Sequence, residues 1–150
     1  MKVIANNKKA FFQYFILEKI EAGIQLFGDE VKSLRHAKAS INEAYAEVKK
    51  GEMFLVNADI AKYEKSSNLN RSDSKRTRKL LISKKDIFRL QGKIDKDGLT
   101  VIPIKIYFNK KGLVKLEIAI AKGKKLYDKR EDKKKKDWDV QKKRLLKNYI

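Results

Sequence analysis

The strongest pattern along the chain is an alternation of apolar and polar positions between residues 102 and 120. Residues 102–108 and 114–120 each place an apolar side chain at every second position, and Asn109-Lys-Lys-Gly112 separates the two runs. This period is typical of half-buried strands, and a short glycine-containing segment between two such runs predicts a hairpin. Pro103 lacks a backbone N–H, so it predicts an edge position or a bulge in the first arm.

Two further hairpins are predicted in the first half of the chain. One has its turn at residues 49–52. The other has its turn at Glu21-Ala-Gly23, where Gly23 is expected to supply an unusual backbone angle. The arms of these hairpins are residues 44–48 and 53–56, and residues 14–20 and 24–26.

Two short helices are predicted, each by an apolar stripe at helical spacing. The first covers residues 30–35, with Asp29 as its N-cap. The second begins after Ser83, whose side chain is placed to cap it, and ends near Gly98. The stripes consist of Val31 and Leu34 in the first helix, and of Ile87, Leu90 and Ile94 in the second.

The order of these elements predicts a mainly β protein. About six strands without a regular βαβ alternation favour a closed antiparallel six-stranded barrel of the oligonucleotide-binding type with short flanking helices. A two-layer sheet with helices on one face is the alternative. From residue 124 onward there is no glycine, no proline and no continuous apolar face. We therefore expect a barrel domain over residues 1–123 and a flexible basic C-terminal tail over 124–150, disordered when free and helical against a polyanion.

The charge balance narrows the choice of partner. The chain has 38 Lys and Arg against 19 Asp and Glu, a formal net charge of +19. Acidic residues can pair with only part of this excess, so the remainder faces solvent or a polyanion, either nucleic acid or an anionic membrane. A general drift toward lysine would also raise the charge, but here the basic residues cluster. No apolar run is long enough for a membrane helix and the N-terminus lacks a signal-peptide core, so we expect no membrane association and a cytoplasmic location.

The sequence contains no constellation that indicates catalysis. Cysteine is absent, which excludes disulfides, thiolate metal sites and cysteine nucleophiles. The single histidine, His36, has no second histidine with which to bind a metal. Neither common glycine-rich phosphate loop pattern occurs. We expect a non-catalytic protein with no cofactor and no metal site.

Three basic clusters are candidates for RNA binding. They are Arg76-Thr-Arg78-Lys79, then Lys122-Gly-Lys124-Lys125, and then the tail. Arginine donates two parallel hydrogen bonds to a phosphate, and lysine supplies a point charge. Tyr127 and Trp138 stand beside basic residues and are suited to stacking on unpaired bases.

Two features leave alternatives open. Glu21 is either a solvent-facing turn residue or a carboxylate that accepts hydrogen bonds from base amino groups or orients a neighbouring cation. The aromatic residues near the N-terminus fit either a core or an RNA-facing surface, and we favour the core. This aromatic group comprises Phe11, Phe12, Tyr14 and Phe15.

Six motifs in order give the chain a family resemblance. They are Asn7-Lys-Lys-Ala10, Tyr14-Phe-Ile16, Glu21-Ala-Gly-Ile24, Glu30-Val-Lys-Ser-Leu-Arg35, Arg76-Thr-Arg-Lys-Leu-Leu81, and Ala121-Lys-Gly-Lys-Lys125 followed by Asp128-Lys-Arg130. Together they resemble the bacterial SsrA-binding protein family, SmpB, along nearly the whole chain. Each motif alone is weak, but their order and spacing are specific.

The resemblance implies a role in trans-translation, the rescue of stalled ribosomes. Members of the family bind the tRNA-like part of transfer-messenger RNA (SsrA RNA). The resemblance further implies functional links to elongation factor Tu and alanyl-tRNA synthetase, and a tail that enters the small-subunit decoding centre and the empty mRNA channel. We expect a monomer.

The resemblance also implies functional residues. Glu21, Leu81 and Ser83 match positions needed for transfer-messenger RNA binding, and Tyr127 matches a position that stacks in the decoding centre. The expected RNA-binding set is Lys8, Lys9, Glu21, Lys32, Arg35, Arg76, Arg78, Lys79, Leu81, Ser83, Lys124 and Lys125. The expected ribosome-binding set in the tail is Tyr127, Asp128, Lys129, Arg130, Trp138, Lys142, Arg144, Leu145 and Leu146.

Overall fold

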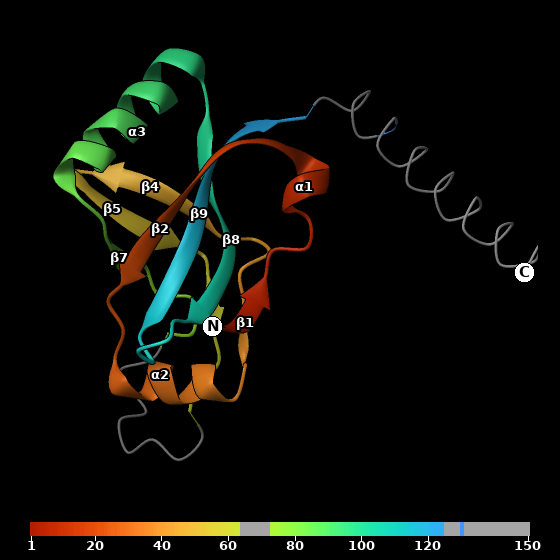
Figure 1. Ribbon diagram of the computed structural model, residues 1–150, viewed down its shortest axis with the longest axis vertical. Helices are drawn as coiled ribbons and strands as arrows, with labels where there is room; N and C mark the ends of the chain where they lie inside the picture. The colour runs from red at the N-terminus through yellow and green to blue at the C-terminus, as the bar shows by residue number, and fades with distance from the viewer. Residues whose placement is uncertain (64–72, 125–129, 131–150) are drawn as a thin grey trace, which may run out of the picture.

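In the part of the chain that the computed structural model describes, seven strands form an antiparallel sheet, two short strands form a separate pair, and three helices lie at the periphery (Figure 1). The structure describes residues 1–63, 73–124 and 130. The strands are β1 (Lys2–Asn6), β2 (Tyr14–Ile24), β3 (Ala39–Ser40), β4 (Tyr45–Lys49), β5 (Glu52–Val56), β6 (Asp59–Ile60), β7 (Arg78–Leu81), β8 (Thr100–Phe108) and β9 (Val114–Gly123). The helices are α1 (Ala10–Gln13), α2 (Gly28–Arg35) and α3 (Lys84–Asp97). Within the described ranges, no helix is both long and apolar enough to cross a membrane.

Six of the strands close into a ring. They pair in the order β8-β4-β5-β7-β2-β9, and β9 pairs again with β8. Every pairing is antiparallel, and β1 adds to the ring by pairing with β8. Helices α2 and α3 lie at opposite ends of the ring (Figure 1). The prediction of a mainly β, closed antiparallel fold with short flanking helices is therefore confirmed.

The ring has its main core inside and a smaller core outside. Leu116, Ile118 and Ile120 of β9 point into the main core, which also takes Leu34 of α2 and Leu90 of α3. Because side chains alternate across a strand, the intervening alanines of β9 point outward. There they form a second cluster beneath α1, which consists of Ala10, Ile102, Ile104, Ala119 and Ala121, with Tyr14 and Ile16 against it.

Two of the predicted hairpins are confirmed. β4 and β5 pair in register, and the turn between them holds Lys50 and Gly51 at positive φ, as a two-residue hairpin loop requires. β8 and β9 pair over nearly their whole length. Their register shifts between Pro103 and Lys105, so proline occupies the predicted bulge.

The second predicted helix is confirmed together with both of its caps. The Asp86 N–H donates to Ser83 Oγ at 3.2 Å, and Gly98 follows the helix in the left-handed region at φ 61°. Glycine adopts this angle without the steric cost that a Cβ imposes. Ile87 and Leu90 of the predicted stripe are buried.

The N-cap predicted for the first helix was wrong. α2 begins at Gly28 and Phe27 is the N-cap, so Asp29 lies inside the first turn. The Phe27 N–H donates to Glu30 Oε1 at 2.8 Å. The carboxylate at the third helical position thus satisfies the backbone N–H of the N-cap residue, which is one half of a capping box.

The predicted hairpin around Gly23 was also wrong. β2 is continuous from Tyr14 to Ile24 and pairs with β9 from Tyr14 to Gly23. Gly23 is needed for a close approach rather than for a turn, since a Cβ at this position would lie 3.1 Å from the Leu81 Cβ. The absent side chain lets β7 pack directly beside β2.

Candidate nucleic-acid interface

Glu21 and Leu81 lie on one outer face of the ring. Glu21 and Gly23 point to the same side of β2, and Gly23 pairs with Leu81 of β7. Ala22 and Leu80 point instead into the main core. Glu21 is exposed and Leu81 keeps 50% of its surface exposed. The pairing of β2 with β7 thus brings together two residues that the sequence placed 60 positions apart.

Tyr107 holds the Glu21 carboxylate in place. Its hydroxyl donates a hydrogen bond to Glu21 Oε2. Burial raises the pKa of the Tyr107 hydroxyl above its ordinary value, and the Glu21 carboxylate raises it further. The hydroxyl therefore stays protonated as a donor. A carboxylate has about four acceptor positions and the tyrosine uses one, so Glu21 retains capacity to accept hydrogen bonds from a ligand.

Further predicted residues surround this face. Lys79 alternates to the same side of β7 as Leu81, and its ammonium lies 3.4 Å from Glu52 Oε1. Ser83 is exposed two residues beyond Leu81, where its hydroxyl donates to Asp86 Oδ2 at 2.9 Å. These positions add one cation and one polar group to the apolar surface of Leu81.

Arg78 lies in the interior of the fold. Its side chain is fully buried, and Nε donates to Glu30 Oε2 at 2.6 Å. Its remaining donors reach the Ala58 carbonyl at 2.8 Å and the Ser74 carbonyl at 2.9 Å. These donors are used inside the protein, where Arg78 joins α2 to β7 and the Ser74 loop, so its contact with RNA stays a prediction.

Arg76 shares the same carboxylate. Its Nη2 donates to Glu30 Oε1, and its guanidinium lies 4.1 Å from the centre of the Phe27 ring. Burial by itself would raise the pKa of Glu30, but hydrogen bonds from Arg76, the Phe27 N–H and Arg78 outweigh burial and lower it. Glu30 therefore stays charged and joins α2 to the segment that leads into β7. Nothing in the isolated sequence paired Glu30 with these arginines.

The two basic residues predicted in α2 are exposed. Arg35 ends the helix, and Lys32 places its ammonium 5.4 Å from the centre of the Tyr63 ring. The ion pairs of Glu30 with Arg76 and Arg78 hold this helix against the segment that leads into β7. His36 follows as the C-cap and is exposed. Among residues 1–63, 73–124 and 130, no group of three or more His, Cys, Asp or Glu side chains is arranged to hold a metal.

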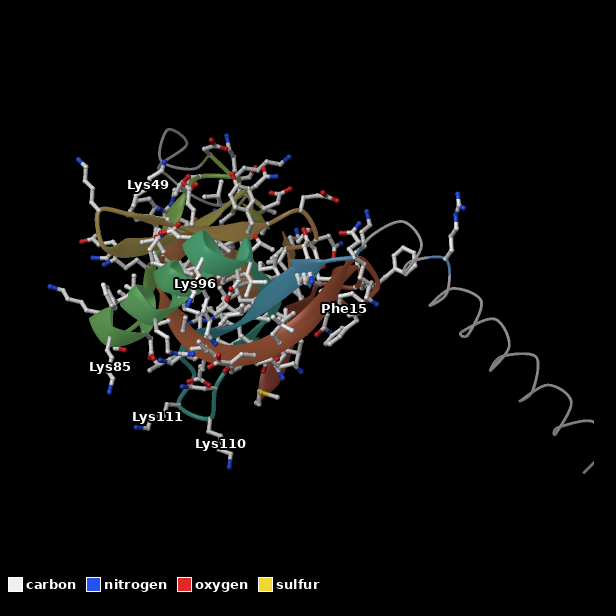
Figure 2. The ribbon with its side chains drawn as sticks, turned by 90° about the horizontal axis from the view of Figure 1, so that it is seen from above. Phe15, Lys49, Lys85, Lys96, Lys110 and Lys111 are labelled. Carbon is white, nitrogen blue, oxygen red and sulfur yellow. The ribbon has the colours of Figure 1, made fainter. Side chains whose placement is uncertain are left out.

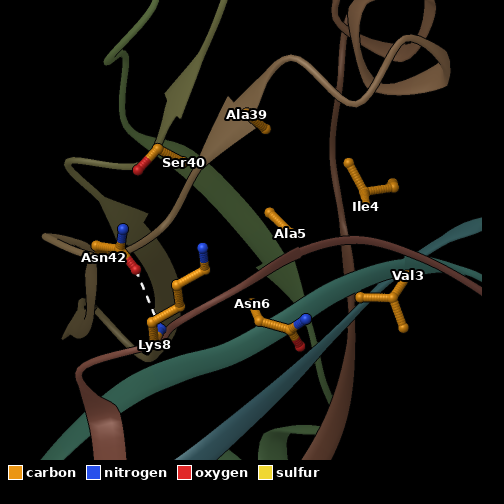
Figure 3. Close-up of a pocket in the computed structure, with 8 residues that line it drawn as sticks. All are labelled: Val3, Ile4, Ala5, Asn6, Lys8, Ala39, Ser40 and Asn42. Carbon is orange, nitrogen blue, oxygen red and sulfur yellow. Dashed lines mark hydrogen bonds between the residues drawn. The ribbon is translucent and has the colours of Figure 1, made fainter.

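A second group of predicted basic residues lies around α1. Lys9 precedes this helix and pairs with Glu43 at 3.4 Å, while Lys124 donates to the Phe11 carbonyl at 3.0 Å. The Lys8 N–H donates to Asn42 Oδ1 at 3.2 Å. Lys8 lines an open depression of about 400 Å³ with residues of β1 and β3 (Figure 3). The predicted site residues described so far therefore lie in three places, namely the face around Glu21, helix α2 with the arginines it binds, and the surroundings of α1.

The remaining predicted residues are mostly outside the described part of the chain. Arg130 is described and is exposed. Lys125 and the ribosome-binding residues other than Arg130 fall in the ranges 125–129 and 131–150, which lie outside the described residues. Tyr107 is a functional candidate that sequence reasoning missed, because its alternation with Ile106 and Phe108 indicated only a strand.

Comparison with known proteins places this geometry in a family. The family model described as SmpB protein matches residues 4–148. An SsrA-binding protein of Thermosipho melanesiensis is 58% identical over 137 residues, which cover 91% of this chain and 92% of that protein. An SsrA-binding protein of Wolbachia pipientis subsp. Culex pipiens is 55% identical over 150 residues, with both chains covered completely.

A solved structure supports the same placement. Its description reads "tmRNA-SmpB: a journey to the center of the bacterial ribosome". The chain matched there is 47% identical to this one, with a TM-score of 0.67 over 81% of this chain and 84% of that chain. The sequence matches span nearly the whole length, and the fold agrees independently. The chain therefore belongs to the SmpB protein family.

Proposed function

We propose that this protein binds the tRNA-like part of transfer-messenger RNA and brings it to stalled ribosomes for trans-translation. The observation that carries this proposal is the full-length match to SsrA-binding proteins, which reaches 55% identity over all 150 residues. The matched structural neighbour is itself described by transfer-messenger RNA, SmpB and the ribosome. We further propose a cytoplasmic location, a monomer, and a binding role without catalysis.

The face around Glu21 is our candidate for specific RNA recognition. Leu81 offers an apolar surface, Lys79 a cation, and Glu21 an oriented acceptor for base amino groups. Phosphate contacts position an RNA without reading it, whereas hydrogen bonds to base edges and shape distinguish one RNA from another. The Glu21 carboxylate is expected to contribute selectivity, because it repels phosphate oxygens and accepts hydrogen bonds from base N–H groups.

We assign the ribosome step to the tail, residues 124–150, as a unit separate from the barrel domain, residues 1–123. The assignment rests on its motif Asp128-Lys-Arg130 and on its basic and aromatic composition, including Trp138. In this proposal the tail contacts the small-subunit decoding centre and the empty mRNA channel. Elongation factor Tu and alanyl-tRNA synthetase are the proposed functional partners of the RNA complex.

The sharpest test of the recognition face reverses the charge of Glu21. Glu21→Arg should weaken binding of the tRNA-like RNA about tenfold or more in a gel-shift titration, although it adds positive charge. Asp97→Arg is the matched control, because Asp97 is exposed at the end of α3 and the same charge is added. Equal affinities for the two variants would remove Glu21 from the RNA-binding site.

Two further measurements test whether the barrel and the tail have separate functions and whether RNA binding is specific. Deleting residues 131–150 should leave RNA binding nearly intact and abolish peptide tagging on stalled ribosomes. Equal loss of both activities would contradict separate barrel and tail functions. Excess total tRNA should fail to displace the transfer-messenger RNA, since displacement would indicate a general nucleic-acid binder.

A further inference from the structure

Four large apolar side chains near the N-terminus are exposed although the sequence favoured a core position for most of them. Phe11 is 55% exposed, Phe12 43%, Phe15 42% and Leu17 58%. The small core beneath α1 is already filled by Ala10 at 1% exposure. These side chains are therefore not needed to cover it. Clustered exposed apolar side chains on a soluble domain indicate an interaction surface.

Lysine ammonium groups lie against two of these rings. The Lys19 ammonium is 5.3 Å from the centre of the Phe11 ring, and the Lys124 ammonium is 4.9 Å from the centre of the Phe15 ring. Lys124 also donates to the Phe11 carbonyl at 3.0 Å, so one side chain ties the two aromatic positions together. Phe15 lies at the end of the ring where β9 ends, and it pairs with Lys122 of that strand (Figure 2).

This surface adjoins the Glu21 face, because Lys19 and Glu21 lie two residues apart on the same side of β2. Lys19 pairs with Glu117 at 3.7 Å, and Lys105 lies 3.7 Å from the other oxygen of that carboxylate. Glu117 lies directly opposite Glu21 on the neighbouring strand β9, so Lys19 stands at the border between the two surfaces. We call Phe11, Phe15, Lys19 and Lys124 the aromatic–lysine surface.

The chemistry of the surface selects its occupant. Aromatic rings beside lysines accommodate bases by stacking and phosphates by charge, which is the usual composition of single-strand binding sites. A basic peptide, including a tail such as residues 131–150, would meet lysines of the same sign. The net charge of +19 favours a polyanion.

We propose that the aromatic–lysine surface binds an unpaired RNA strand, with bases stacked on Phe11 and Phe15 and phosphates held by Lys19 and Lys124. As a base takes a ring face, the ammonium moves from the ring to the adjacent phosphate. Stacking tolerates any base, so this surface binds single strands without sequence preference. This inference rests on the proposed function, because it takes the partner to be RNA.

The test uses the full-length protein and a fluorescent oligouridylate of about 12 nucleotides, within the usual span of a single-strand site. Phe11→Ala with Phe15→Ala should weaken binding about tenfold or more, given roughly 5-fold to 150-fold per stacked base. Phe11→Tyr with Phe15→Tyr should retain the affinity. Phe88→Ala is the matched control, since Phe88 is 82% exposed on α3 and is not part of the aromatic–lysine surface.

Salt dependence separates stacking from charge. The double alanine variant should keep the wild-type salt slope, whereas Lys19→Ala with Lys124→Ala should reduce it by about 0.7 for each phosphate that is no longer neutralised. Unchanged oligouridylate affinity in the double alanine variant would overturn the inference. So would sedimentation showing a wild-type dimer that the double alanine variant dissociates, because the surface would then bind a second copy. The proposed function fails separately, if wild-type protein shows no preference for transfer-messenger RNA over bulk RNA.

Discussion

Replacing Glu30 with glutamine should destabilise the fold by about 3–5 kcal/mol, because it leaves a buried arginine without an opposing charge. Glu30 is 5% exposed and Arg78 is fully buried. Glutamine keeps the size of the side chain and one acceptor oxygen, so the packing is preserved and the charge is the main change. A typical domain has only about 5–15 kcal/mol of stability, so this single charge is expected to matter greatly.

Urea unfolding near neutral pH measures the effect. The midpoint should fall while the slope stays constant, since the same surface is exposed on unfolding. Glu43→Gln is the control, because Glu43 and Lys9 form a pair whose side chains are 73% and 55% exposed. Exposed pairs contribute about 0–1 kcal/mol. Our reasoning is refuted if Glu30→Gln loses no more stability than this control.

Acidification provides an independent check on the same residue. The pKa of Glu30 is lower in the folded protein than its ordinary value, so the unfolded chain takes up a proton first as the pH falls. The stability contributed by Glu30 is therefore complete above about pH 4.3, the ordinary value for glutamate, and is lost as the pH falls through the folded value. The difference between wild type and Glu30→Gln should shrink across that acidic range. A difference that stays constant there would show that the charge is not responsible.

Three further substitutions test other contacts. Gly23→Ala should cost about 1–2 kcal/mol in urea unfolding, because its Cβ would crowd Leu81, and no loss would contradict the close approach. Gly92→Ala should instead stabilise by about 0.5–1 kcal/mol, since Gly92 lies inside α3 with nothing within 4 Å of an added Cβ. Tyr107→Phe removes the donor that orients Glu21. The substitution should lower the free energy of unfolding by about 1 kcal/mol and raise the Kd for the tRNA-like RNA about fivefold. An unchanged Kd would show that RNA binding does not depend on this orientation of Glu21.

The elements predicted correctly are those whose signals are local. The β8–β9 hairpin follows from strict alternation around a short turn, and α3 follows from a stripe bounded by Ser83 and Gly98. The hairpin predicted at Gly23 failed because glycine serves both turns and close approaches. The close approach at Gly23 can be recognised only from the tertiary structure, which places Leu81 of β7 opposite it. The predicted core position failed similarly for Phe11, Phe12 and Phe15, because alternation does not show that Ala10 already fills the outer core, whereas Tyr14 does pack against that core.

For the candidate site, the sequence by itself determined which charged, polar and apolar residues are available to bind RNA. The tertiary structure decided which of them are exposed and lie together. Motif order identified Glu21 and Leu81 as RNA-binding candidates, and the clustered positive charge favoured a polyanionic partner. Only the β2–β7 pairing placed those two residues on one face. Only the packing of α2 showed that Arg78 is neutralised by Glu30, 48 positions earlier in the chain. Charges and patterns are properties of residues, whereas burial and pairing depend on neighbours that are distant in sequence.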